Sequence, residues 1–386
     1  MKDIRKPGFF GEAVHFKNRS MLREVLTAFL LFFIGTFMGA LIQTPVMMVY
    51  FLTDKEYLNM ISSGRIDNQT IMEMVSKMPN WVVALTLCGT AGTLIATIFY
   101  YKVIEKRSLL SLGFQKKRAA GFYLFGMLLG TCFLGCCYLS GSVMGIYRID
   151  FSMTGEKAVP VILLFFVGYM IQGLAEEVLC RGFLFVVLTK KYPVFYALIL
   201  SSLFYALLHG FHNNVSILAY INLILFGGLM GLLFLRFENI WLVGAFHGIC
   251  DFILTNVFGM KESGLEADEF LFSVQTAENS DVLHGGKYGL TGGLLLTIVL
   301  VFAILLLLVG MYHRQMIIPI EENFVQEEKE EVAPVLLEYR EFKRVDLERE
   351  KPEPYPPIGK VEEMNERILR EEKETSTVFD RDYFKD

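Results

Sequence analysis

Charge is scarce over most of this 386-residue chain, and that scarcity is the first guide to its class. Charged residues make up 20% of the sequence and hydrophobic residues 53%, with a mean hydropathy of +0.44. A water-soluble globular domain is excluded, because uninterrupted apolar runs of about 20 residues recur and no water-facing fold buries them. The sequence also lacks a positive stripe interleaved with aromatic residues, so we expect no nucleic-acid partner.

Three further absences narrow the class. No internal repeat is visible, which gives no support to a transporter built from duplicated halves. No small-residue cleavage site follows the first apolar run, which is also too long and too late in the chain for a cleaved signal peptide. There is no disulfide framework, because every cysteine lies in an apolar span, where we expect it to pack as a small buried hydrophobe. These cysteines are Cys88, Cys132, Cys136, Cys137, Cys180 and Cys250.

The apolar spans predict an all-α fold, a polytopic membrane bundle of about eight transmembrane helices. Their expected bounds are 24–50, 81–101, 119–141, 160–188, 193–212, 215–235, 240–259 and 289–312. Residues 160–188 make a helix of about 43 Å, longer than the hydrocarbon core, so we expect this span to be tilted or broken. Small residues four apart favour close helix contacts. The pairs are Gly35 with Gly39, Gly126 with Gly130, and Gly227 with Gly231.

Basic residues indicate how the spans are oriented. They cluster in the first 23 residues, in the loop 102–118, and directly after the fourth, sixth and eighth spans. The alternate loops mix charges or are acidic. By the positive-inside rule we expect an integral protein of the plasma membrane with both termini in the cytoplasm.

The chain divides into four parts. Residues 1–157 hold three spans, 158–258 hold the next four, and 259–313 hold an outer loop and the last span. Residues 314–386 carry 21 acidic and 13 basic residues, a net charge of about −8, which leaves about +3 for the rest. This acidic, proline-containing tail is expected to be largely disordered and cytoplasmic, with a short helix near 361–374. It is either simply solvated or docks a cytoplasmic partner.

Polar side chains are expensive in a bilayer and usually functional, and groups of them that include Glu, Arg, His or Asp gather in three spans. They are Gln172, Glu176, Glu177 and Arg181 in the fourth span, Tyr205 and His209 in the fifth, and His247 and Asp251 in the seventh. A spacing of four residues places Glu177 with Arg181 on one helix face, and the other two spans repeat that spacing. We expect Arg181 to neutralise Glu177 and to leave Glu176 facing a cavity.

Two carboxylates and two imidazoles in a site of low dielectric constant support two kinds of chemistry. One group can take a proton from water while the others stabilise the charge that develops on a carbonyl. Alternatively, Glu176, His209, His247 and Asp251 can hold a zinc ion that activates a water. A structural interpretation also exists, with a Glu–Arg ion pair and histidines that only bond between helices. The joint occurrence in three spans favours a site.

These residues carry a family resemblance. Glu176-Glu177-x-x-x-Arg181, then Tyr205-x-x-x-His209, then His247-x-x-x-Asp251, resemble the three motifs of the CAAX protease and bacteriocin-processing family, also called type II CAAX prenyl endopeptidases. The resemblance covers residues 158–258, about a quarter of the chain. It implies an intramembrane endopeptidase in which Glu176 with His209 activates water and His247 with Asp251 polarises the scissile carbonyl. Glu177, Arg181 and Tyr205 would order the site.

Two departures from the family pattern matter. Tyr205 replaces the usual Phe and adds a hydroxyl that can hydrogen-bond within the site. Asp251 stands at a position where the eukaryotic members have Asn. Asp at this position resembles the form seen in many prokaryotic members. An ionised Asp cannot donate to an oxyanion, so Asp251 is protonated, orients His247 or helps to hold a metal. The cofactor stays open between zinc and none.

The expected substrate is a membrane-associated peptide or protein. Leader processing, peptide-pheromone maturation and self-immunity are settings that fit the prokaryotic-type motif. The rival interpretation is a catalytically silent membrane scaffold or regulator of the same fold.

Overall fold

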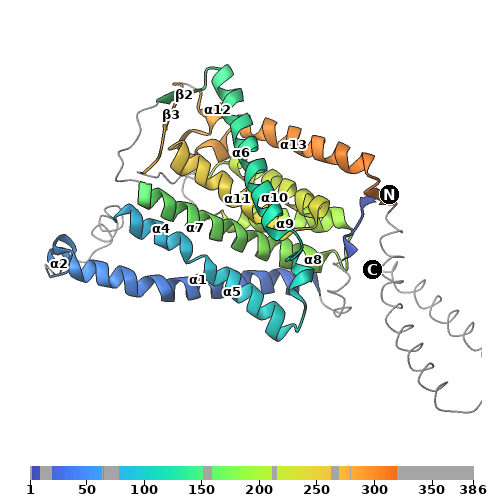
Figure 1. Ribbon diagram of the computed structural model, residues 1–386, viewed down its shortest axis with the longest axis horizontal. Coiled ribbons are helices and arrows are strands. Elements are labelled where there is room, and N and C mark those ends of the chain that lie inside the picture. Colours follow the sequence, from blue (N-terminus) through green and yellow to red (C-terminus); the bar gives the residue numbers. More distant parts are fainter. Residues whose placement is uncertain are drawn as a thin grey trace, which may run out of the picture. The chain divides into compact units, whose positions relative to one another are not determined.

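The computed structural model of the chain describes residues 2–8, 20–62, 64, 78–150, 159–210, 215–261, 269–278 and 280–319. The chain separates into two units, Met1–Glu327 and Glu328–Asp386. The second lies wholly outside the described residues, as do the acidic tail beyond Pro319 and its expected short helix. The fold of the first unit is all-helical and polytopic, as the sequence predicts (Figure 1).

Seven helical segments are long and apolar enough to cross a membrane. They are α1 (Met21–Thr53); α4 (Asn80–Cys88) with α5 (Ala91–Phe99) and a π-helical turn (Tyr100–Ile104); α6 (Ala119–Val143); α7 (Val159–Glu177) with a π-helical segment (Val178–Phe185) and α8 (Val186–Leu188); α10 (Ile217–Phe237); α11 (Ile240–Phe252) with a π-helical turn (Ile253–Val257); and α13 (Leu294–His313). Short elements complete the described part: α2 (Lys55–Ser62), α12 (Asp281–His284) and 3-10 turns at Leu109–Leu112, Gly286–Tyr288 and Leu290–Gly292.

The remaining expected span, 193–212, is shorter than predicted. Helix α9 (Val194–Leu208) has 15 residues, so at 1.5 Å per residue it is about 22 Å long. It ends before His209, which caps its C-terminus, and residues 211–214 are outside the described part.

Contacts between chain segments show that α9 nevertheless counts as a crossing. Asp3 accepts hydrogen bonds from the backbone N–H groups of Val194 and Phe195, at 3.0 and 3.1 Å. Ile240 N–H donates to the Gly113 carbonyl at 3.0 Å, which places the turn before α11 on the same side as the loop after α5. Four crossings separate Asp3 from Val194 and two separate Asp3 from Gly113. Val194 and Ile240 therefore lie on the same side of the membrane. Because α10 crosses once between them, α9 must cross once as well.

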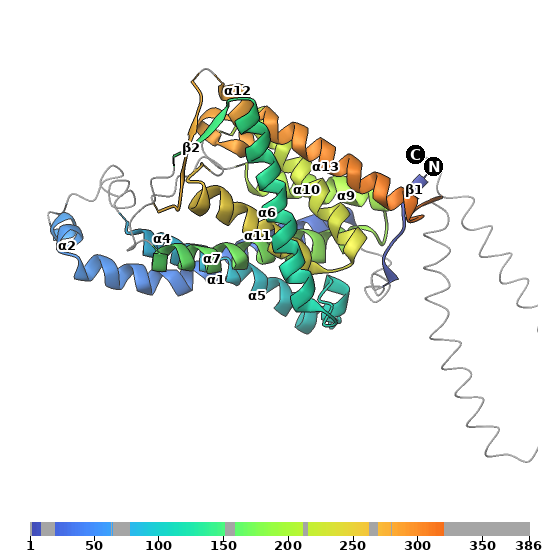
Figure 2. The same ribbon diagram turned by 45° about the horizontal axis from the view of Figure 1, so that its top comes forward.

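Two small antiparallel sheets lie at opposite ends of this unit (Figures 1 and 2). Strand β1 (Lys2–Ile4) pairs with β4 (Ile317–Pro319), which places the segments before α1 and after α13 on one side. Strand β2 (Tyr147–Asp150) pairs with β3 (Ser273–Thr276) and joins two loops that the sequence places together on the other side. The sequence does not predict these strands, because three or four residues carry no readable alternation.

Three spans depart from a regular α-helix, among them the long span 160–188 that was expected to be tilted or broken. The span predicted at 81–101 bends at Gly89 and Thr90, where i→i+3 hydrogen bonds replace the helical ladder and separate α4 from α5. The long span 160–188 stays helical but switches to π-helix directly after Glu177, and α11 switches just after Phe252. Such π segments are frequent at functional sites. Here side-chain hydroxyls bond the local carbonyls: Ser201 to Cys180 at 2.8 Å and Thr255 to Asp251 at 2.7 Å.

Helix α11 packs against both α6 and α7, and small residues make the approach close (Figure 1). At Gly173 of α7, a Cβ would collide with the Gly248 backbone nitrogen and lie 2.8 Å from the Gly244 carbonyl oxygen of α11. The glycine pairs expected to favour close contacts do so. Gly35 and Gly39 face the bend between α4 and α5, Gly126 and Gly130 face α11, and Gly227 and Gly231 face α9. All six cysteines are free thiols, as predicted, but they are not all buried. Cys137, Cys180 and Cys250 are buried and Cys88 is half-buried, whereas Cys132 and Cys136 are exposed on α6, where the expected burial is wrong.

The crossing of α7 and α11 yields the first prediction. We expect Gly173→Ala to lower stability by about 1–3 kcal/mol, because the added methyl overpacks a backbone contact. Gly228→Ala, on α10, is the matched control: nothing lies within 4 Å of its Cβ position, so greater helix propensity should make it neutral or stabilising. Thermal unfolding of the detergent-purified chain measures both. Equal melting temperatures for the two variants would contradict the proposed packing constraint.

Candidate active site

Glu177, at the end of α7, is the most deeply buried ionisable group of the predicted set. Its carboxylate is fully buried and its Oε1 accepts from Arg181 Nη1 at 2.8 Å. The same Oε1 lies 2.9 Å from Nδ1 of His247, on α11. Arg181 is also buried, and its guanidinium lies over the Tyr205 ring at 4.8 Å. Gly227 leaves the room that it needs, since a Cβ there would approach Arg181 Nη2 to 3.1 Å.

The contact with Glu177 fixes how His247 is presented. A carboxylate only accepts hydrogen bonds, so Nδ1 of His247 carries a hydrogen and donates. On the other ring nitrogen, Nε2, the neighbours are looser: the Tyr205 hydroxyl and Asp251 Oδ2, each at 3.4 Å, and Glu176 Oε2 at 3.9 Å. These exceed ordinary hydrogen-bond lengths. One nitrogen of His247 is therefore anchored and the other is within reach of a reacting group.

Glu176 points away from the Glu177 pair, as the sequence predicts. Gln172, one turn earlier on α7, donates to Glu176 Oε1 at 3.1 Å. The second oxygen, Oε2, lies 3.7 Å from His209 Nε2 and 3.9 Å from His247 Nε2. Glu176 lines a cavity of about 300 Å³ between α7, α1 and the bend of α4–α5. A carboxylate flanked by two imidazoles at a cavity wall is an arrangement that can hold and deprotonate a water.

The end of α9 positions the second histidine. His209 lies in the first turn after the helix, and its Nδ1 is 3.0 Å from the Tyr205 carbonyl oxygen, so that Nδ1 donates and Nε2 is presented to Glu176. The rings of Tyr205 and His209 are 4.6 Å apart. Phe226 of α10 packs edge-on against His247, at 5.1 Å between ring centroids. Aromatic rings thus surround the imidazoles and limit their rotation.

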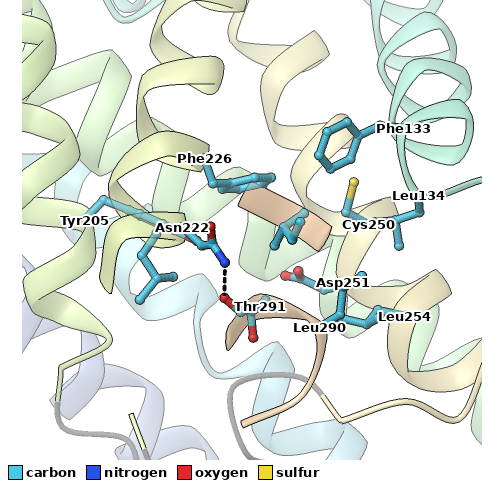
Figure 3. A pocket seen from close by; sticks show the side chains of 12 residues that line it. Phe133, Leu134, Tyr205, Asn222, Phe226, Cys250, Asp251, Leu254, Leu290 and Thr291 are labelled. Carbon is cyan, nitrogen blue, oxygen red and sulfur yellow. Dashed lines mark hydrogen bonds between the residues drawn. The ribbon is translucent and has the colours of Figure 1, made fainter. Parts of the chain in front are cut away.

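Asp251 lines a second, smaller cavity of about 40 Å³, shown in Figure 3. Its walls are mostly apolar. Asn222 closes it: its side-chain nitrogen donates to the carbonyls of Thr291 and Gly293, at 3.0 and 2.9 Å, and its oxygen accepts from Thr297 at 2.7 Å. A space of this size holds no more than a few waters. The larger cavity beside Glu176 is therefore the one with room for a ligand.

All seven site residues that the sequence predicts come together in the structure, from α7, its π segment, α9 and α11. Of the three roles open to Asp251, its 3.4 Å contact with Nε2 favours orienting His247. Sequence reasoning assigned no role to Gln172, Phe226 or Asn222. Gln172 lies four residues before Glu176, and Asn222 is a strongly polar residue in an apolar span, so both had a readable signal.

Comparison with known families agrees with this geometry. Residues 158–253 match the family model described as type II CAAX prenyl endopeptidase Rce1-like. The chain carries a domain of this family. Among curated proteins, no relative matches the chain. The Rce1-like domain covers about a quarter of the sequence and contains all seven site residues, and its family supports the fold of a CAAX-type intramembrane protease.

The residues of the Rce1-like domain do not form a metal site in their present arrangement. Among the described residues, no group of three or more His, Cys, Asp or Glu side chains is placed to hold a metal ion. His247 directs one nitrogen to Glu177, and only its other nitrogen is near Glu176 and Asp251.

The buried pair yields the second prediction. We expect Arg181→Met to destabilise the chain by about 3–5 kcal/mol, because Glu177 then keeps a buried charge without its cationic partner. Adding Glu177→Gln to Arg181→Met should recover part of the loss. Arg148→Met is the control, since Arg148 is exposed on β2 and its removal should change stability by no more than about 0.5 kcal/mol. Thermal unfolding in detergent measures all three. A double variant less stable than Arg181→Met alone would show that the unpaired charge is not the cause.

Proposed function

We propose that this protein is an intramembrane endopeptidase that cleaves a peptide bond of a membrane-associated peptide or protein with a water activated by Glu176 and His209. The observation that carries the proposal is the position of Glu176 Oε2. It lies within 4 Å of Nε2 of both His209 and His247, and Glu176 is part of the lining of the 300 Å³ cavity. The Rce1-like family supports protease chemistry for such a fold.

In the proposed reaction, a water lies between Glu176 and His209. The Glu176 carboxylate takes one proton from it, and the water oxygen forms a bond to the scissile carbonyl carbon. The carbonyl oxygen accumulates negative charge as its double bond opens. When the tetrahedral species collapses, the C–N bond breaks and the proton held by Glu176 goes to the leaving nitrogen. His209 holds the water in line and shares the proton during the transfer.

His247 serves the opposite pole of the reaction. With Nδ1 donating to Glu177 at 2.9 Å, a second hydrogen on Nε2 can donate to the carbonyl oxygen as charge develops. Asp251 and Glu177 flank the ring, one at each nitrogen. The Tyr205 hydroxyl, 3.4 Å from Nε2, is a second donor to the same oxygen.

Replacing Glu176 tests the proposed reaction. Glu176→Gln keeps the shape of the side chain but removes the base, so we expect cleavage to fall by at least about a hundredfold while the melting temperature is kept. Glu238→Gln is the control, an exposed Glu at the end of α10. The measurement compares the peptide termini present in membranes that contain each protein, by mass spectrometry. If the Glu176→Gln and wild-type profiles are identical, the protein is not a peptidase of this type and the scaffold interpretation gains.

The proposed location is the plasma membrane, with Lys2–Ile4 and Ile317–Pro319 on the cytoplasmic side and β2–β3 outside. The acidic tail then lies in the cytoplasm, available to a cytoplasmic partner. Cysteines at exposed positions of the two sides test this: Lys116→Cys after α5 and Arg148→Cys on β2. In intact cells, an impermeant thiol reagent should label Arg148→Cys only, and permeabilisation should expose Lys116→Cys. The parent chain, with its cysteines inside the spans, is the background control. The reverse labelling pattern would invert the proposed topology.

A further inference from the structure

The cavity beside Glu176 has a wall that lies outside the Rce1-like domain. Helix α7 contributes Glu176, but the opposite side is formed by α1 and by the bend between α4 and α5. This wall carries polar side chains among apolar ones, although it lies about halfway along both spans. They are Thr36 and Gln43 of α1, Thr86 and Thr90 at the bend, and Thr93 of α5. Polar side chains gathered at mid-span are costly in a bilayer, and non-helical backbone at that depth occurs where it lines a cavity.

The hydrogen bonds of this wall determine what it can recognise. Thr36 Oγ1 donates to the Phe32 carbonyl at 2.9 Å, and Thr90 Oγ1 donates to the Leu87 carbonyl at 2.6 Å. Thr86 does the same one turn away, to Val83. A hydroxyl has one hydrogen and two lone pairs. Because each of these three hydroxyls donates its hydrogen to a carbonyl of its own helix, its oxygen can only accept further hydrogen bonds.

Gln43 adds rigidity to the same wall. Its side-chain nitrogen donates to the Thr86 carbonyl at 2.5 Å and so joins α1 to the bend. Gly39 allows the approach, because a Cβ there would collide with the Gly89 carbonyl. The hydrogen bond from Gln43 to Thr86 therefore keeps α1 and the α4–α5 bend together. It thereby fixes the positions of the Thr36 and Thr90 hydroxyl oxygens relative to each other.

Acceptors at Thr36 and Thr90, opposite Glu176, match a ligand that presents N–H groups. The Thr93 hydroxyl and the second amide hydrogen of Gln43 remain as donors in the same wall, so it also suits a ligand with carbonyl groups. The backbone of an extended peptide supplies an N–H group at every residue other than proline, and leaving these groups unpaired in an apolar medium is costly. The volume of about 300 Å³ is at the lower end of the range for ligand sites.

We propose that α1 and the α4–α5 bend form a backbone-binding subsite, in which Thr36 and Thr90 accept hydrogen bonds from N–H groups of the substrate next to the scissile bond. This inference rests on the proposed function for its placement beside the reacting bond. A smaller cavity of about 100 Å³ continues the subsite along α1 and α4, sharing Gln43, Thr86 and Gly89 with it. Its other walls are apolar, which suits the side chains of the same peptide.

Binding of a generic peptide tests the subsite apart from catalysis. The probe is a fluorescein-labelled dodecapeptide of alternating alanine and leucine, because backbone recognition does not require the natural sequence. The parent is the full chain with Glu176→Gln, in nanodiscs, so that no cleavage intervenes. Adding Thr36→Val or Thr90→Val should raise the dissociation constant about three- to tenfold, the effect of losing one hydrogen bond. Thr36→Ser, which keeps the hydroxyl, should restore binding.

The matched control is Thr44→Val, also on α1. Thr44 bonds back to the Ala40 carbonyl at 2.7 Å in the same way but does not line the cavity, so its replacement should leave the dissociation constant unchanged. A series of probes methylated at one backbone nitrogen each provides the second readout. One of these probes should bind the parent weakly and lose nothing more from Thr36→Val, because the same hydrogen bond has already been removed.

Three results would overturn the subsite: no measurable binding of the probe to the parent, equal affinities for Thr36→Val, Thr90→Val and Thr44→Val, or penalties from methylation and from Thr36→Val that simply add for every probe. Failure of the proposed function is read separately, from identical peptide termini with wild-type and Glu176→Gln membranes. If that occurs while the binding pattern holds, the chain binds peptide backbones at this wall without cleaving them.

Discussion

The arrangement of the site depends on one buried carboxylate. Glu177 bonds Arg181 one turn later on its own span and His247 on the facing helix, so a single oxygen sets the rotation of α7 relative to α11. Without water to solvate these charges, breaking either contact leaves a buried charge uncompensated, which is strongly destabilising. With Nδ1 of His247 held in this way, Nε2 must lie between Glu176 and Asp251. The catalytic proposal for Glu176 thus begins with the residue beside it.

The packing of the helices serves this contact. Gly173, Gly244 and Gly248 allow α7 and α11 to cross at backbone distance, one turn from the charges. Gly227 leaves room for the Arg181 guanidinium, which then lies against the Tyr205 ring. The π-helical segments begin at Val178, one residue after Glu177, and at Ile253, two residues after Asp251, and the hydroxyls of Ser201 and Thr255 bond carbonyls close to these points.

The features that could be predicted from the sequence are those that depend on residues close together in the chain. Apolar runs define the spans, and ionisable residues four apart, such as Glu177 with Arg181, give the site. The cavity wall was not predictable, because Thr36 and Thr90 meet Glu176 only through the packing of spans far apart in the sequence. The bend at Gly89 was not predictable either, because no proline in that span indicates a break in the helix. The length of α9 was overestimated because the sequence does not show where its helical hydrogen bonds end: His209 and Gly210 bond carbonyls three residues back instead of four.

The contacts of Asp3 bear on how the chain is assembled in the membrane. A helix of 15 residues is a weak candidate for independent insertion, and its first N–H groups are bonded by a carboxylate 191 positions earlier. During synthesis Asp3 can therefore bond the start of α9 only after the four preceding spans have been inserted. Helix α9 then enters most favourably together with α10, against which it packs, as a hairpin. Strand β4 can pair with β1 only when α13 is in place, so this sheet joins a segment before the first described span to one after the last.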